Sequence, residues 1–351
     1  MYTEADLQSA VAAGALSHEA AEALRAHAAG MRSAPIADEE QFRLINGFND
    51  IFVTIAAILL LAAAGGIGAA IAPGVAGLLI AGAAWGLAEF FTARRRMALP
   101  SIVLLLAFVG GVVAVPVNIL AETDPDMAGR TAALIAAAIG LGAGIAAWLH
   151  WRRFMVPITV AAGAAAVVAT ALALTLAALE PLVGEERLEA LLLPLVFVAG
   201  LGMFAFAMRW DMSDPARETR RSDVAFWLHL LAAPMIAHPL FNWLGVTGGD
   251  NIGAGSALGV LAIYVLMGLV ALAVDRRALL VSALAYVLIA LTWLFREFGM
   301  VELNVAITGL VIGSALLCLS AFWSPIRRVI VQQLPATLRT RLPVTAIPVP
   351  A

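Results

Sequence analysis

The polar residues that could do chemistry in this chain are few, and several of them fall in one apolar stretch. That stretch contains His229, His238 and Asn242, together with Pro234 and Pro239. His238 and Asn242 would share one face of a helix, whereas His229 and His238 would point to opposite faces, which disfavours a pair of metal-ligating histidines. A proline-kinked helix can line a cavity. One hypothesis therefore makes His238 and Asn242 solute contacts, and the alternative makes them hydrogen-bonding links between helices.

Two carboxylates complete the set of candidate ion or solute contacts, because charged groups at membrane depth are costly and therefore often functional. Glu89 lies near the end of an apolar block, within reach of the arginines at 94–96. This position predicts that Glu89 forms an ion pair at the membrane surface. The alternative is that Glu89 belongs to an ion or proton site. Asp50, preceded by Asn46 and Asn49, begins the first apolar block. A carboxylate there can cap backbone N–H groups and meet the positive end of the helix dipole.

No catalytic residue, metal site or cofactor is predicted. The sequence contains no HExxH, no phosphate-binding glycine loop, and no Ser/His/Asp set that its spacing brings together. The single cysteine, Cys318, lies in an apolar block and is interpreted as a packing residue. Nucleic-acid binding is disfavoured because residues 1–42 are acidic and no arginine-rich helix appears.

The elements that must position these residues are membrane-spanning helices. Apolar residues make up 62% of the 351 positions, charged residues only 13%, and the mean hydropathy is +0.96, values far from those of soluble domains. The apolar residues form blocks long enough to cross a hydrocarbon core of about 30 Å. The sequence predicts an all-α fold, a polytopic transmembrane helical bundle of about ten spans. The expected spans are 51–71, 74–92, 98–120, 131–149, 155–179, 190–209, 224–244, 253–274, 278–295 and 304–323.

The arginines predict the orientation of the spans. Alternate connections and the carboxyl-terminal tail hold fifteen arginines, whereas the other connections hold only Arg130, Arg187 and Arg296. Positive residues are retained on the cytoplasmic side. We therefore expect a multi-pass membrane protein with both termini in the cytoplasm.

Three regions are expected along the chain. Residues 1–45 form a cytoplasmic helical hairpin and linker, residues 46–323 the transmembrane bundle, and residues 324–351 a cytoplasmic tail with an interfacial helix at 326–334 and a Pro-rich end. Within residues 3–30, Ser17 can cap a second short helix after a first that stops at Gly14. Because so short a segment cannot bury its own core, it is expected to dock on a cytoplasmic protein.

Several segments resemble a group of bacterial membrane proteins of unknown function. They are LQSAVAAGALSHEAAEALRAH in the hairpin, NGFNDIFVTIAAILLL, AEFFTARRRMALPS and MSDPARETRRSDVAFWLHLLAAP. The resemblance covers most of the chain and implies an inner-membrane location with an amino-terminal helical hairpin. It implies no activity and no binding residues.

Three classes of function remain open. The near absence of charge at membrane depth favours a non-enzymatic scaffold or sensor that recruits a partner through its hairpin. The alternative is a secondary transporter of a small solute with its site on the proline-containing seventh span. A membrane-embedded enzyme is least supported, since no acid, base or metal cluster is evident. The oligomeric state stays open.

Overall fold

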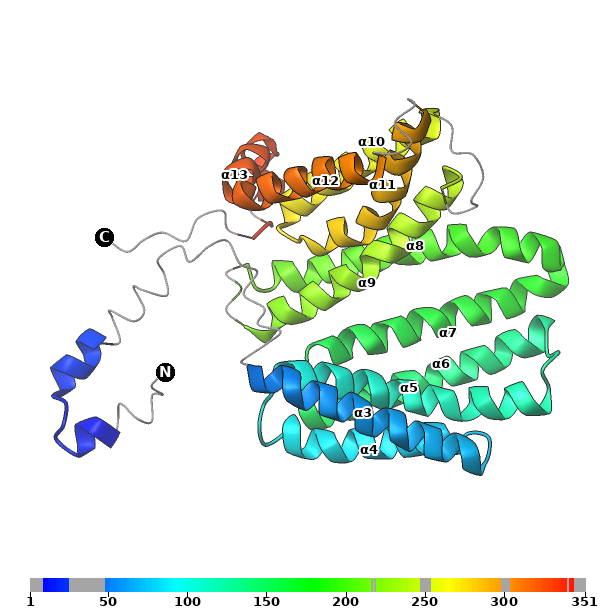
Figure 1. Ribbon diagram of the computed structural model, residues 1–351, viewed down its shortest axis with the longest axis horizontal. Helices are drawn as coiled ribbons and strands as arrows, with labels where there is room; N and C mark the ends of the chain where they lie inside the picture. Colours follow the sequence, from blue (N-terminus) through cyan, green and yellow to red (C-terminus); the bar gives the residue numbers. More distant parts are fainter. Residues whose placement is uncertain are drawn as a thin grey trace.

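The computed structural model describes residues 9–24, 48–215, 217, 219–246, 254–297, 304–339 and 341–343, and within these ranges the chain is all-α (Figure 1). Each predicted apolar block forms a helix, and the ends of these helices differ from the predicted ends by no more than five residues. These helices are α3 (Phe48–Ile71), α4 (Val75–Phe91), α5 (Ala98–Thr123), α6 (Gly129–Phe154), α7 (Ile158–Val183), α8 (Glu185–Met212), α9 (Arg220–Trp243), α10 (Ala254–Val274), α11 (Ala278–Glu297) and α12 (Asn304–Ala321).

Seven of the described helices are long and apolar enough to cross a membrane. An eighth span is formed if α12 and the following helix, which are bent by 73° at a short break, count as one. The helices α4 and the described part of α11 are apolar but shorter. The structure thus supports seven or eight spans in its described part, fewer than the ten expected.

The outer faces of the helices carry apolar side chains. On α3, Phe52, Leu59 and Ile67 are each more than half exposed, and comparable side chains lie on the other long helices. A soluble protein would leave such a surface in contact with water, whereas lipid tails match it. The chain is therefore an integral, multi-pass membrane protein.

The arginine-bearing turns meet at one end of the bundle, on the left in Figure 1. Arg153, at the end of α6, pairs with Glu89 near the end of α4. Arg217, between α8 and α9, pairs with Asp275, between α10 and α11. Arg220 donates to the carbonyl oxygen of Met155, in the turn between α6 and α7 (3.5 Å). We call this end of the bundle, formed by the turns 92–97, 155–157, 213–219 and 275–277, the arginine end.

The helices form two groups (Figure 1). In the first, α3, α4 and α5 contact one another, α5 contacts α6, and α6 packs along α7. In the second, α9 contacts α8 and α11, and α11 contacts α10 and α12. Contacts of α7 with α8 and α9 join the two groups. This junction brings the turn between α6 and α7 close to the start of α9.

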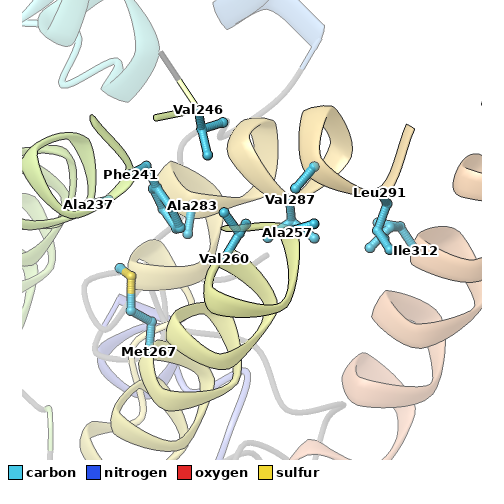
Figure 2. Packing of buried hydrophobic residues seen from close by; sticks show 11 residues of the cluster. Ala237, Phe241, Val246, Ala257, Val260, Met267, Ala283, Val287, Leu291 and Ile312 are labelled. Atoms are coloured by element: carbon cyan, nitrogen blue, oxygen red, sulfur yellow. The ribbon is translucent and has the colours of Figure 1, made fainter. Parts of the chain in front are cut away.

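The second group has an apolar core of its own. Figure 2 shows Phe241 of α9, Val260 of α10, Val287 and Leu291 of α11, and Ile312 of α12 directed into one cluster. In the first group the buried residues are mostly small, such as Ala57, Ala84 and Ala88. Small side chains let helices approach closely where the hydrophobic effect does not drive their association.

The helices α4 and α5 approach each other closely through glycine. A Cβ added at Gly77 would lie 2.5 Å from the carbonyl oxygen of Gly111, and one added at Gly111 would lie 2.8 Å from the carbonyl oxygen of Gly77. The surroundings of two other helix glycines differ from each other. Gly140 packs against Thr170 of α7, whereas Gly255 has nothing within 4 Å of its Cβ position.

The two ends of the described chain are also helical. Residues 9–12 and 18–24 form the predicted short hairpin; Gly14 has a φ of 71°, and the Ser17 hydroxyl accepts from the backbone N–H of Ala20 (3.0 Å). Thr3 and Gly30, the other expected ends of these helices, lie outside the described residues. The expected tail helix is α13 (Trp323–Gln333), which begins three residues earlier than predicted and is followed by the single turn α14 (Ala336–Arg339).

Candidate functional site

Four buried polar side chains of the described chain form a cluster that we call the ion cluster: Asp211, Ser222, His229 and Arg276. Asp211 and Arg276 are 1% and 2% exposed, and His229 is fully buried. The Arg276 guanidinium donates to both carboxylate oxygens of Asp211, and its Nε lies 3.2 Å from Oδ2. The Nη2 of Arg276 also donates to the carbonyl oxygen (3.0 Å) and the hydroxyl (3.3 Å) of Ser222.

Local structure explains how these side chains meet. Asp211 lies in the last turn of α8. Ser222 and His229 lie seven residues apart on α9, which places them two turns apart on one face. Asp275 adopts a φ of 61°, and this left-handed residue ends α10 and directs Arg276 back between α8 and α9. The ion cluster therefore links the end of α8, the start of α9 and the turn before α11.

His229 completes the ion cluster from α9. Its Nε2 lies 2.9 Å from Oδ2 of Asp211, and the ring lies 5.2 Å from that of Phe204. The other ring nitrogen, Nδ1, is buried and has no hydrogen-bond partner among the described residues. Neither nitrogen faces solvent, so the arrangement holds charge in place and offers no accessible base.

A second group, the turn cluster, lies beside the first and consists of Arg217, Asp275, Trp323 and Arg327. Arg217 donates to Oδ2 of Asp275 (2.8 Å) and to the carbonyl oxygens of Val274 (3.2 Å) and Asp275 (3.0 Å). The indole N–H of Trp323 donates to Oδ1 of Asp275 (2.7 Å).

Arg327 ties the tail to the same turn cluster. Its Nε lies 3.6 Å from Oδ1 of Asp275, and its Nη2 donates to the carbonyl oxygen of Pro343 (2.7 Å). Burial lowers the pKa of the Arg217 guanidinium, and the neighbouring charge of Arg276 lowers it further, while Asp275 acts in the opposite direction. An arginine nevertheless keeps its charge at any physiological pH, so Asp275 remains its ion-pair partner.

The predicted candidates on α9 are separated in space. His229 is buried and His238 is exposed, which agrees with their expected opposite faces. His238 does not stand in a described cavity with Asn242; its Nδ1 lies 2.7 Å from the hydroxyl of Tyr286 on α11. This contact is the hydrogen bond between helices that the sequence offered as the alternative. The helix α9 contains Pro234 and Pro239 in its interior, as expected.

Glu89 forms an ion pair, but not with the arginines that follow it in sequence. Its Oε1 and Oε2 accept from Nε (2.9 Å) and Nη2 (2.5 Å) of Arg153. The expected partners, at 94–96, are corrected to an arginine of α6 because the packing of α4 against the end of that helix presents Arg153 in a bidentate orientation.

Asp50 is buried in the first turn of α3, where the sequence expects it. Its backbone carbonyl accepts a hydrogen bond from the Thr54 hydroxyl (2.6 Å). A carboxylate in this position is favoured by the positive end of the helix dipole. Asn46 lies outside the described residues.

Of the four residues of the ion cluster, sequence reasoning named only His229 as a candidate. Arg276 was counted only among the arginines of the connections, and Asp211 and Ser222 were not singled out as candidates; the structure buries Asp211 and Arg276 at helix ends. The available signal was an acidic residue within an arginine-rich connection. It could not name the partner, because Arg276 lies 65 residues further along the chain.

An apolar groove lies between α6 and α7 and has a volume of about 720 Å³. It is lined by small residues, among them Gly140, Gly144 and Gly163, and by the aromatic residues Trp148, Trp151 and Trp210. Such a surface accommodates hydrocarbon and offers little to a polar solute.

Metal binding finds no support in the described part of the chain, where no three His, Cys, Asp or Glu side chains are grouped so that they could hold an ion. No protein family, no curated protein and no solved structure matches this chain. The resemblance to bacterial membrane proteins of unknown function thus identifies no family, and the site must be interpreted from its own geometry.

Proposed function

We propose that this protein is a non-enzymatic membrane scaffold or sensor of the bacterial inner membrane, with its arginine end in the cytoplasm. The observation that carries the proposal is the pair of clusters at that end. The ion cluster joins α8, α9 and the turn before α11, and the turn cluster joins that turn to α13. Together they hold segments that are far apart in sequence in one fixed arrangement at this end, which is what a docking platform requires.

The orientation follows from the arginines at the arginine end. Positive residues stay on the cytoplasmic side of a bacterial membrane, and the turns at 92–97, 155–157, 213–219 and 275–277 all lie together. If every one of these turns is cytoplasmic, each helix from α3 to α12 crosses the bilayer once. The proposal therefore includes ten spans, with both termini in the cytoplasm.

The shortest of these spans, α4, has 17 residues. At 1.5 Å per residue it is about 26 Å long, a few ångströms less than a hydrocarbon core of about 30 Å. Local thinning of the bilayer accommodates a difference of this size at modest cost.

The amino-terminal hairpin is the proposed docking segment. In its described part Ala21 is fully buried, while Ser17, Glu19 and Glu22 are exposed. Exposed carboxylates on a short helix suit a cytoplasmic protein with a basic surface. Residues 1–45 would carry this partner, and residues 46–323 would anchor it to the membrane.

The transporter alternative would place its solute site at His238 and Asn242, with His229 nearby. The contact between His238 and Tyr286 supports a structural role, because it joins α9 to α11. His229 is engaged by Asp211. These contacts favour the scaffold over a transport site on α9.

Deletion of residues 1–40 tests the proposal. We expect the truncated protein to insert and to keep its thermal stability, but to lose a cytoplasmic protein that copurifies with the full-length chain, measured by quantitative mass spectrometry of detergent-solubilised complexes. The matched control is Glu19→Gln with Glu22→Gln, which keeps the hairpin and removes only its exposed charges; weakened copurification in this variant would locate the contact on that face. Recovery of the same proteins in the same amounts after the deletion would refute docking through the hairpin.

A further inference from the structure

A cavity of about 460 Å³ opens at the arginine end, away from the ion cluster and the turn cluster. Three arginines from three different segments line it: Arg96 from the turn between α4 and α5, Arg153 from the end of α6, and Arg220 from the start of α9. All three side chains belong to exposed residues, so their guanidinium groups are accessible. Their convergence depends on the packing of both helix groups, because Arg220 belongs to the second group and the other two to the first.

The balance of charge around the cavity is positive. Glu89 neutralises Arg153 in part, through the two hydrogen bonds described above. Asp223 acts on Arg220 from the next turn of α9 but is not part of the cavity wall. No carboxylate is among the lining residues.

Two helix amino termini add to this positive field. Met97 and Ala98 begin α5, Pro157 precedes α7, and neither terminus has a side-chain cap. The first backbone N–H groups of a helix carry a partial positive charge and suit an anion.

One buried polar group in the wall also has an unmet hydrogen bond. Thr92 is 8% exposed, and its Oγ1 is buried without a hydrogen-bond partner in the described structure. A buried hydroxyl without a partner costs free energy unless a ligand or water satisfies it. Thr92 lines the same cavity as the three arginines, so an occupant with acceptor oxygens would satisfy it.

The backbone supports the same interpretation. Arg96 and Met155 line the cavity with φ values of 52° and 56°, in the left-handed region. For residues with a side chain this conformation is unfavourable. In both turns the chain therefore keeps an unfavourable conformation that holds the cavity wall in shape.

We propose that this cavity binds the phosphate group of an anionic membrane lipid. Arginine recognises phosphate through paired, charge-assisted hydrogen bonds. Ile102, Phe154, Val156 and Trp227 supply apolar walls beside the arginines, as a glycerol backbone and the start of an acyl chain require. The cavity also lies where membrane helices end, at the depth of lipid headgroups, and basic pockets between such helices suit anionic headgroups.

Native mass spectrometry of the full-length protein with added phosphatidylglycerol tests the proposal. We expect selective retention of phosphatidylglycerol over phosphatidylcholine. The variant Arg96→Gln with Arg220→Gln, which leaves the pair of Glu89 and Arg153 intact, should weaken that retention about tenfold or more through the loss of charge-assisted hydrogen bonds.

The matched control is Arg94→Gln with Arg221→Gln, which removes the same charge from the same two segments outside the cavity lining. It should retain the lipid as the unaltered chain does. Thr92→Val removes the unpartnered hydroxyl and should weaken retention by a smaller factor. Circular dichroism and thermal unfolding establish that each variant is folded.

Equal losses in the cavity variant and the control would show a general charge effect and overturn the site. So would equal retention of the two lipids by the unaltered protein. If inorganic phosphate at the same concentration displaces the lipid, or binds where phosphatidylglycerol does not, the cavity takes free phosphate and the lipid assignment is wrong. Because these readouts do not involve the hairpin, they test lipid binding independently of the scaffold function.

Discussion

Asp211 and Arg276 are 65 residues apart in the chain, and their pairing buries a negative and a positive charge side by side. Removal of one partner leaves the other charge buried without compensation, which is far more costly than removal of both. His229 and Ser222 satisfy the remaining hydrogen-bonding capacity of the pair. The ion cluster is thus a single unit and not a sum of separate contacts.

We expect Arg276→Met to lower the free energy of unfolding by about 3–5 kcal/mol, since Asp211 would stay buried without its counter-charge. The double variant Asp211→Asn with Arg276→Met should be less destabilised than the sum of the two single variants. Denaturant unfolding in mixed micelles measures both quantities.

Arg209→Met is the control for this series because Arg209 is exposed two residues before Asp211. It should change stability by less than about 0.5 kcal/mol, as surface substitutions usually do. Additive effects of Asp211→Asn and Arg276→Met would contradict the view of the cluster as one unit.

The helices α4 and α5 show how backbone contact organises the first helix group. At Gly77 and Gly111 the two backbones approach so closely that a methyl group on either residue would meet a carbonyl oxygen of the other helix. Close approach of this kind replaces the hydrophobic effect as the source of packing energy within a bilayer. The same helix, α5, begins at Ala98, which lines the proposed lipid cavity.

Gly77→Ala should therefore destabilise the protein by about 1–3 kcal/mol, as overpacking does. Gly82→Ala, one and a half turns along the same helix, has open space at its Cβ position. It should be neutral or slightly stabilising, because alanine favours a helix over glycine by up to about 1 kcal/mol. Thermal unfolding of the two variants in the same detergent makes the comparison, and equal melting temperatures would argue against a close contact at Gly77.

At the scale of the whole molecule, the arginine-bearing turns of both helix groups lie at the same end. The turns that carry arginine lie together, and the connections at 72–74 and 124–128 lie at the opposite end (Figure 1). By the positive-inside rule, that separation predicts that the arginine end lies in the cytoplasm. The assignment of α4 as a full span depends on it.

Single cysteines in a Cys318→Ser background test this topology. We expect Arg95→Cys to be protected from a membrane-impermeant maleimide added to intact spheroplasts, and Pro73→Cys and Glu185→Cys to be labelled, because the proposed orientation places the first position in the cytoplasm and the other two outside. Labelling after membrane disruption gives the control for reactivity. If Arg95→Cys and Glu185→Cys behave alike, the alternating topology is wrong. If Pro73→Cys is protected together with Arg95→Cys while Glu185→Cys is labelled, α3 and α4 form a re-entrant pair.

The sequence by itself determined that the chain is all-α, where its helices run, and which connections carry positive charge. Hydropathy and backbone hydrogen bonding are local properties: a bilayer leaves each apolar block only the helical conformation, and composition then sets its length. The bounds of α5 and α10 therefore agree closely with the predicted spans. The hairpin turn at Gly14 and the cap at Ser17 were predictable because helix capping is also a local property.

Only the tertiary structure decided which charges meet. Glu89 lies five residues before Arg94 in sequence, yet it pairs with Arg153, 64 residues away. Asp211 likewise finds Arg276, and Arg96 joins Arg220 in one cavity. These partnerships depend on distances between helices, which arise from the shapes of many small side chains packed together, and no spacing within one segment encodes them.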